Sequence, residues 1–264
     1  MHKAVNDGLS KVPAVTLGFW VVKIVATTLG ETGGDAVSMP PLELGYAVAS
    51  AIFIGIFLVA VLAQIAVKKF HPFLYWAVIV ATTTAGTTMA DFADRSLGIG
   101  YPGGASILFI LLILSLGIWY WSEGTISVDS VKTPRVEIFY WLAIMFSQTL
   151  GTALGDWMAD TNGLGYQLGA LVFSGGLVLI AAAYFFTRIS RTILFWSAFI
   201  LTRPLGATLG DYLDKPIAHG GLDISRLTAS LILAAFMIVA ILLLKQQAAR
   251  KEARLAGVEA SRSR

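Results

Sequence analysis

Carboxylates recur at one fixed position in four similar stretches of the sequence. A glycine stands ten residues after each of four tryptophans, and an aspartate stands fifteen residues after each. These residues are Trp20, Trp76, Trp141 and Trp196, then Gly30, Gly86, Gly151 and Gly206, then Asp35, Asp91, Asp156 and Asp211. Carboxylate oxygens bind hard cations and exchange protons. The recurrence therefore predicts four equivalent carboxylates that act together.

A second acid accompanies each aspartate at helical spacing. The second acids are Glu31, Asp94, Asp160 and Asp214. Each lies three or four residues from its aspartate, which places the pair on one face of a helix. Eight carboxylates would converge if the four stretches surround one axis. The alternatives are solvated loop acids and helix N-caps, and the adjacent Arg95 and Lys215 would neutralise part of the charge.

Two basic residues stand inside apolar segments. Lys23 follows Trp20 by three residues, and Arg203 follows Trp196 by seven. The residues that occupy the Arg203 position in the other stretches are Thr27, Thr83 and Gln148. Charges at membrane depth are costly and mark pathways, so these residues are candidates for a polar path. Hydrogen bonding that only holds helices together is the alternative.

Composition places these residues in a membrane. Of 264 residues, 56% are hydrophobic and 13% are charged, whereas soluble domains carry about 25% charged residues. Eight apolar segments are each long enough to span a core of roughly 30 Å as a helix. They are Pro13 to Gly30, Leu44 to Val67, Pro72 to Ala90, Ala105 to Trp121, Val136 to Gly155, Leu164 to Thr187, Thr192 to Gly210, and Leu227 to Leu244. The sequence predicts an all-α membrane protein with eight transmembrane helices.

The four stretches define four parallel two-helix repeats. Their expected ranges are 12–67, 70–121, 134–187 and 190–244, which together form one membrane domain over 12–244. Each odd-numbered segment carries small residues four apart, a pattern that lets helix backbones approach closely in lipid. We therefore expect the odd-numbered helices to form the inner bundle and the even-numbered helices to surround it.

Basic residues predict the orientation of the chain. Fourteen lysines and arginines fall in the termini and in alternate connections, and three fall in the remaining connections. By the positive-inside rule, both termini are expected to be cytoplasmic. This gives a cytoplasmic N-terminal segment at 1–11, a basic cytoplasmic tail at 245–264, and a multi-pass location in a bacterial inner membrane.

The repeats resemble a known family. The stretches read LGETGGD, AGTTMAD, LGTALGD and LGATLGD in turn, each after its tryptophan. The chain is similar, over about Val12 to Leu244, to bacterial membrane proteins with four tandem two-helix repeats of unknown function. The stretch from Lys23 to Met39 carries the resemblance most clearly. It implies the fold and the membrane location, and little about activity.

Several classes of function find no support in the sequence. It contains no phosphate-binding loop, dinucleotide fingerprint, zinc-protease motif or nucleophile elbow, so a protein that is not an enzyme is favoured. There are no cysteines, and His2, His71 and His219 lie outside the apolar segments, which disfavours a transition-metal centre. No resident cofactor is expected apart from a bound divalent cation, and no nucleic-acid partner is expected.

These features favour a transporter of a small ion. Oxygen ligands without cysteine or histidine suit hard ions, and a divalent cation such as manganese is the first expectation. The expected metal ligands are Glu31, Asp35, Asp91, Asp156 and Asp211. The wider substrate-binding set adds Lys23, Thr27, Gln148 and Arg203. Expected partners are the lipid bilayer and the ion, with a homo-oligomer left open.

Two alternatives stay open. Lys23 and Arg203 would also suit a small anion, and a non-transporting scaffold or assembly protein would pair its internal charges. A water-accessible cavity at Lys23 and Arg203 favours transport, whereas a dry bundle with both charges paired favours a scaffold.

The charge asymmetry makes the topology testable. Reporter fusions after Val67 and Thr187 should read as cytoplasmic, and fusions after Gly100 and Gly163 should read as external, because alternate connections carry the basic residues. Paired phosphatase and fluorescent-protein fusions measure this. The reverse pattern, or an odd number of crossings, would contradict the model.

Overall fold

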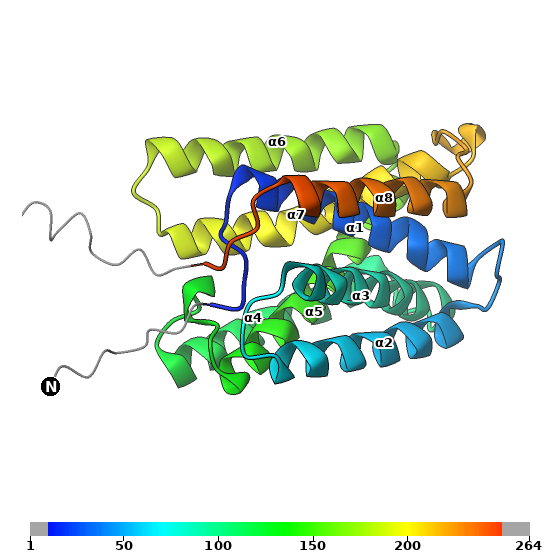
Figure 1. Ribbon diagram of the computed structural model, residues 1–264. Coiled ribbons are helices and arrows are strands. Elements are labelled where there is room, and N and C mark those ends of the chain that lie inside the picture. Colours follow the sequence, from blue (N-terminus) through cyan, green and yellow to red (C-terminus); the bar gives the residue numbers. More distant parts are fainter. Residues whose placement is uncertain (1–9, 250–264) are drawn as a thin grey trace, which may run out of the picture.

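The structure is a bundle of long helices (Figure 1). The computed structural model describes residues 10–249, apart from the side chain of Thr161. The long helices in this range are α1 (Leu17–Ser38), α2 (Tyr46–Ala66), α3 (Pro72–Asp91), α4 (Tyr101–Glu123), α5 (Pro134–Asp156), α6 (Gly165–Phe186), α7 (Arg191–Asp214) and α8 (Arg226–Leu243). The prediction of an all-α chain with eight main helices is confirmed, and residues 10–249 form no sheet.

Local signals set several of the helix starts. Thr16 and Thr133 precede α1 and α5, and their side chains accept hydrogen bonds from backbone N–H groups of the first turn. Prolines begin α3 and α5, where a missing N–H costs nothing.

The end of α1 differs from the expected segment. The segment was expected to end at Gly30, but the helix continues to Ser38 and includes Gly30, Gly33 and Gly34. Glycine is a poor helix former. Here Gly30 and Gly34 lie against Thr83 and Thr87 of α3, so tight contact outweighs propensity.

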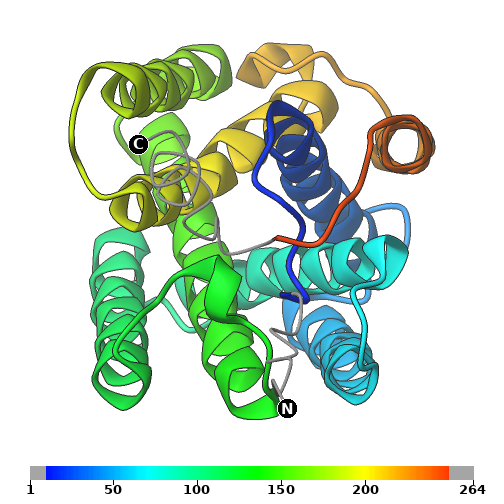
Figure 2. The same cartoon turned by 60° about the vertical axis from the view of Figure 1, so that its left-hand side comes forward.

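The odd-numbered helices form a closed inner ring. α1 packs against α3 and α7, and α5 packs against the same two helices. Each even-numbered helix lies outside, along the inner helix of the following repeat: α2 along α3, α4 along α5, and α6 along α7. The last helix, α8, lies along α1 and closes the circle, as Figure 2 shows with α8 in orange-red and α1 in blue.

Glycines set the spacing of this ring in cyclic order. Each glycine that stands ten residues after a tryptophan faces the residue seven after the tryptophan on the next inner helix. The pairs are Gly30 with Thr83, Gly86 with Gln148, Gly151 with Arg203, and Gly206 with Thr27. A Cβ atom on Gly151 would lie 2.3 Å from Cγ of Arg203, and one on Gly206 would lie 2.2 Å from Oγ1 of Thr27. Only glycine fits these contacts without displacing the neighbour.

The tryptophans form a second cyclic set at one end of the ring. The aromatic residue before each tryptophan stacks on the tryptophan of the next inner helix. Ring centroids lie 5.4 Å apart for Phe19 and Trp76, 5.6 Å for Tyr75 and Trp141, 6.2 Å for Tyr140 and Trp196, and 5.8 Å for Phe195 and Trp20. Such tilted and edge-on contacts are favourable for aromatic pairs. Eight aromatic rings therefore fill this end of the inner bundle.

Apolar side chains cover the outer helices. In the most apolar stretch of α2, 28% of residues are buried, against 72% for α7. Seven helices are long and apolar enough to cross a membrane, which is consistent with a multi-pass membrane protein. Helix α1 is the eighth, and it falls outside this set. It carries Lys23, Glu31 and Asp35, all buried against neighbouring helices.

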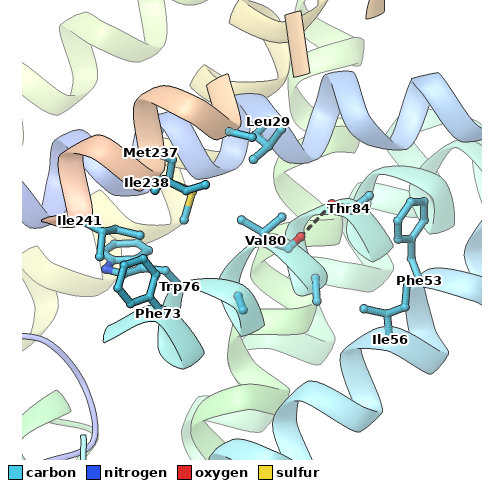
Figure 3. Close-up of a pocket in the computed structure, with 13 residues that line it drawn as sticks. Leu29, Phe53, Ile56, Phe73, Trp76, Val80, Thr84, Met237, Ile238 and Ile241 are labelled. Carbon is cyan, nitrogen blue, oxygen red and sulfur yellow. Dashed lines mark hydrogen bonds between the residues drawn. The ribbon is translucent and has the colours of Figure 1, made fainter. Parts of the chain in front are cut away.

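An apolar groove opens on the outside of the bundle between α2, α3 and α8 (Figure 3). Phe53 and Ile56 of α2, Trp76 of α3, and Met237 and Ile241 of α8 contribute to its walls. Its lining contains no charged side chain, so it suits contact with lipid chains and lies apart from the polar candidates.

Segments near the two ends of the described chain meet at the aromatic end of the bundle. Pro13 pairs with Ala248 in an antiparallel bridge. Lys11 is buried, forms an ion pair with Glu137 at 2.6 Å, and donates to the carbonyls of Gln64 and Val67 at the end of α2. Lys11 was expected in a cytoplasmic segment at 1–11. Residues 1–9 of that segment lie outside the described residues. So do residues 250–264 of the expected cytoplasmic tail.

The ring contacts predict a large effect for a small substitution. In Gly86→Ala, the new Cβ would lie 2.9 Å from the backbone N of Thr149, and a backbone neighbour cannot rotate away. Overpacking of this kind costs about 1–3 kcal/mol, so the free energy of unfolding in detergent should fall. Gly55→Ala in α2 meets nothing within 4 Å and is the matched control. Equal stability of the two variants would contradict the tight ring.

Candidate functional site

The predicted site residues line the axis of the inner ring in successive levels. Lys23 comes first after the aromatic end. Thr27, Gln148 and Arg203 follow at the next level, then Glu31, and then the aspartates at the far end. All nine predicted residues are at most 2% exposed: Lys23, Thr27, Glu31, Asp35, Asp91, Gln148, Asp156, Arg203 and Asp211. They form a buried polar column, which is what a 3.6-residue period along four facing helices produces.

Lys23 is a buried amine without an acid beside it. Its Nζ lies 3.5 Å from Oε1 of Gln148, 3.4 Å from Oγ1 of Thr202, and 4.2 Å from the centre of the Phe199 ring. Among residues 10–249, no carboxylate lies within ion-pair distance of it. Desolvated cations can be stabilised by aromatic faces, but these contacts are long and leave the ammonium weakly satisfied.

Arg203 forms the central ion pair with Glu31. Its Nη2 donates to Oε2 of Glu31 at 2.8 Å, to Thr87 at 2.6 Å and to Thr152 at 2.5 Å. Arg203 is completely buried and Glu31 is 2% exposed. The four residues come from the four inner helices, so the Nη2 atom of Arg203 connects its own helix to the other three. Its Nε and Nη1 have no hydrogen-bond partner in the described part of the chain.

Three carboxylates meet beyond this pair. Glu31, Asp156 and Asp211 each offer an oxygen, and these oxygens lie within 4.8 Å of one another. They come from α1, α5 and α7. We name this set the carboxylate triad. Oδ1 of Asp156 is buried and has no hydrogen-bond partner among the described residues. Such an arrangement can hold a hard cation or share a proton.

Asp35 belongs to a neighbouring group. Together with Asp211 and Asp214 it offers a second set of oxygens within 4.8 Å. Lys215 lies 2.6 Å from Asp35 and 3.0 Å from Asp211, and Arg226 at the start of α8 lies 3.4 Å from Asp214. Burial alone lowers the pKa of Lys215, but the charges of Asp211, Asp35 and Asp214 outweigh burial and raise that pKa well above its usual value. Lys215 is therefore a fixed cation at this mouth.

Asp91 is the predicted ligand that stands apart from both groups. It pairs with Arg95 at 2.9 Å, and Arg95 reaches Asp156 at 3.4 Å. Arg95 lies in a π-helical turn, η1 (Phe92–Ser96), directly after Asp91, and a matching turn η3 (Trp157–Thr161) follows Asp156. Single π turns often occur at functional sites. Here η1 places the guanidinium of Arg95 beside Asp91 and Asp156.

The sequence did not reveal the partners of the predicted residues. Thr87, Thr152, Thr202, Phe199 and Arg226 complete the contacts described above. Thr87 and Thr152 occupy the position of Glu31 in repeats two and three, and that register is the signal that could have identified them. Nothing local marks Arg226, because it comes from the last outer helix.

The two deep charges differ in their environments. Lys23 and Arg203 are both 0% exposed. Arg203 has a carboxylate partner and Lys23 has none. The arrangement therefore matches neither a solvated cavity nor a bundle with every charge paired.

These features define an eight-helix protein with a fourfold internal repeat around a charged axis. A family model described as Repeat of Unknown Function (DUF347) matches residues 18–70, 74–125, 139–190 and 194–248. The chain belongs to this family, which confirms the resemblance seen in its sequence. No curated protein and no solved structure matches it.

The Arg203–Glu31 pair predicts strong thermodynamic coupling. Arg203→Met or Glu31→Leu alone strands a buried charge and should lower the free energy of unfolding by about 3–5 kcal/mol. The double variant should cost less than the sum of the two. Denaturant unfolding in detergent measures this cycle.

The pair of the exposed Arg135 and the half-buried Glu123, at 3.1 Å, serves as the comparison. Its coupling should stay below about 1 kcal/mol. Additive effects at Arg203 and Glu31 would contradict the central pair.

Proposed function

We propose that the protein transports a small cation across the bacterial inner membrane, with both termini in the cytoplasm. A divalent ion such as Mn²⁺ is the first candidate. The carboxylate triad is the binding site, and Asp35 and Asp91 lie at its mouth. In this orientation the aspartates face outward and the aromatic end faces the cytoplasm.

The carboxylate triad is the observation that carries the proposal. Three buried oxygens within 4.8 Å repel one another, by about 4 kcal/mol for two unit charges 4 Å apart at an effective dielectric constant near 20. A bound cation or proton removes that repulsion. Helix α5 ends at Asp156, and Asp211 lies in the last turn of α7, which ends at Asp214. The helix dipole adds negative potential at such C-terminal turns and strengthens cation binding further.

The basic residues beside the carboxylate triad suggest how cation binding could lead to movement of the inner helices. Arg203 holds Glu31 from the inner side, and Lys215 holds Asp211 from the outer side. Arg95 lies 3.4 Å from Asp156, the third member, so a cation that enters the triad competes with all three basic residues. Displacement of Arg203 from Glu31 would also release Thr87 and Thr152, because all three accept from the same Nη2 atom. The inner helices could then shift relative to one another. For the ion to pass to the cytoplasmic side, the contacts of Lys23 and of the aromatic end must also open.

Transport assays with matched variants test the proposal. Purified protein in lipid vesicles should move at least one of Mn²⁺, Mg²⁺, Ca²⁺ and Na⁺, each measured separately with an ion-sensitive dye. Glu31→Gln, Asp35→Asn and Asp156→Asn should reduce transport to the level of empty vesicles. Elution of each variant as a single species in detergent checks that it is folded, above all for Glu31→Gln, which leaves Arg203 without its acid. Asp223→Asn changes an exposed acid and should leave transport intact.

Two outcomes would overturn the cation assignment. One is wild-type protein that neither moves these ions nor binds them in calorimetry. The other is movement of an anion, with Arg203→Gln as the inactive variant. In that case Lys23 and Arg203 bind the substrate and the acids are structural.

A further inference from the structure

A set of buried hydrogen-bond donors lies below the carboxylate triad. We name Lys23, Thr83, Ser147, Gln148 and Arg203 the donor cluster. Each is 0% exposed. Nε2 of Gln148, Nε and Nη1 of Arg203, and the hydroxyls of Thr83 and Ser147 have no hydrogen-bond partner among residues 10–249. Buried polar groups are almost always satisfied, so several unsatisfied groups in one place indicate a missing acceptor.

The fold brings these donors to one level of the ring. Thr83, Gln148 and Arg203 occupy the same position, seven residues after the tryptophan, on three successive inner helices. Ser147 precedes Gln148 in α5. Lys23 joins them from α1, through Gln148 at 3.5 Å and through Thr202, the neighbour of Arg203, at 3.4 Å. All four inner helices therefore contribute.

The charge of this level is not balanced. Glu31 pairs with Arg203 at 2.8 Å, and Lys23 has no acid of its own. Glu31 lies eight residues beyond Lys23 on α1, which is about 12 Å along a helix axis. An uncompensated ammonium in a dry interior is expensive. Water could satisfy the free donors, but it could not neutralise the charge.

We propose that the donor cluster binds a small monovalent anion, such as a halide or nitrate, next to Lys23. Such an ion accepts hydrogen bonds and donates none, which fits a cluster whose N–H and O–H groups are left without an acceptor. It also supplies the missing negative charge. This site shares Arg203 with the ion pair to Glu31, but its other members lie outside the carboxylate triad, so the two sites can be tested separately.

Stability in exchanged salts tests the anion site. Purified protein is prepared in sodium gluconate, and chloride, bromide or nitrate replaces gluconate at constant ionic strength. Unfolding is followed by tryptophan fluorescence. Each tenfold increase in anion concentration above the dissociation constant should raise the folded-to-unfolded ratio about tenfold. Lys23→Met should remove this dependence, and Lys68→Met, an exposed lysine, should retain it.

Gln148→Glu is a second variant, in which the protein itself supplies the negative charge that the anion would bring. It places a carboxylate where the amide now lies 3.5 Å from Lys23 Nζ. The protein should then be stable in gluconate and insensitive to the anion. Asp156→Asn alters the triad and its contact with Arg95 but no member of the donor cluster. It should keep the anion response, so failure of the cation proposal can be told apart from failure of this one.

Three results would overturn the anion site. Wild-type protein that is equally stable in gluconate and chloride would show that Lys23 is neutral, or that water alone fills the donor cluster. A full anion response in Lys23→Met would place any binding elsewhere. The same holds for a full response in Gln148→Glu.

Discussion

The contact of a glycine with the next inner helix sets the geometry of the whole bundle. Gly30, Gly86, Gly151 and Gly206 each face the residue seven after the following tryptophan. Close backbone approach at small residues is a common way for apolar helices to pack together. Because the contact repeats in cyclic order, it also decides which side chains point to the axis. The polar column exists because the ring is this narrow.

The side chains that form the central ion pair stand at positions where the four repeats carry different residues. The position that faces the glycine holds Thr27, Thr83, Gln148 and Arg203 in turn, and the position four residues later holds Glu31, Thr87, Thr152 and Ala207. Arg203 can extend across Gly151 because that glycine has no side chain. Its partner Glu31 comes from the opposite end of the sequence. At these two positions a symmetric scaffold thus carries one ion pair, between Arg203 and Glu31. Lys23, one turn nearer the aromatic end, has no carboxylate within ion-pair distance among residues 10–249, which makes the axis directional in charge.

Some of this was predictable from the sequence and some was not. The helices, the repeat and the buried acids follow from spacing, because position along a helix fixes which face a residue occupies. The partners do not follow, since Arg95 with Asp156 and Arg203 with Glu31 join residues from different inner helices. The end of α1 at Ser38 was missed because glycine propensity argues against it. Arg226 was missed because its position depends on where α8 closes the ring.

Each outer helix packs on the inner helix of the next repeat, and this arrangement constrains the order in which the bundle can assemble. A repeat is not a self-contained unit, since its second helix covers its successor's inner helix, and α8 covers α1. The bridge between Pro13 and Ala248 brings the two ends of the described chain together. The circle therefore has no structurally required first repeat, and a circular permutant opened in a connection between repeats retains every helix contact. In the natural order, α1 stays uncovered on one flank until α8 has been synthesised, so the bundle can close only after the second helix of the fourth repeat is present.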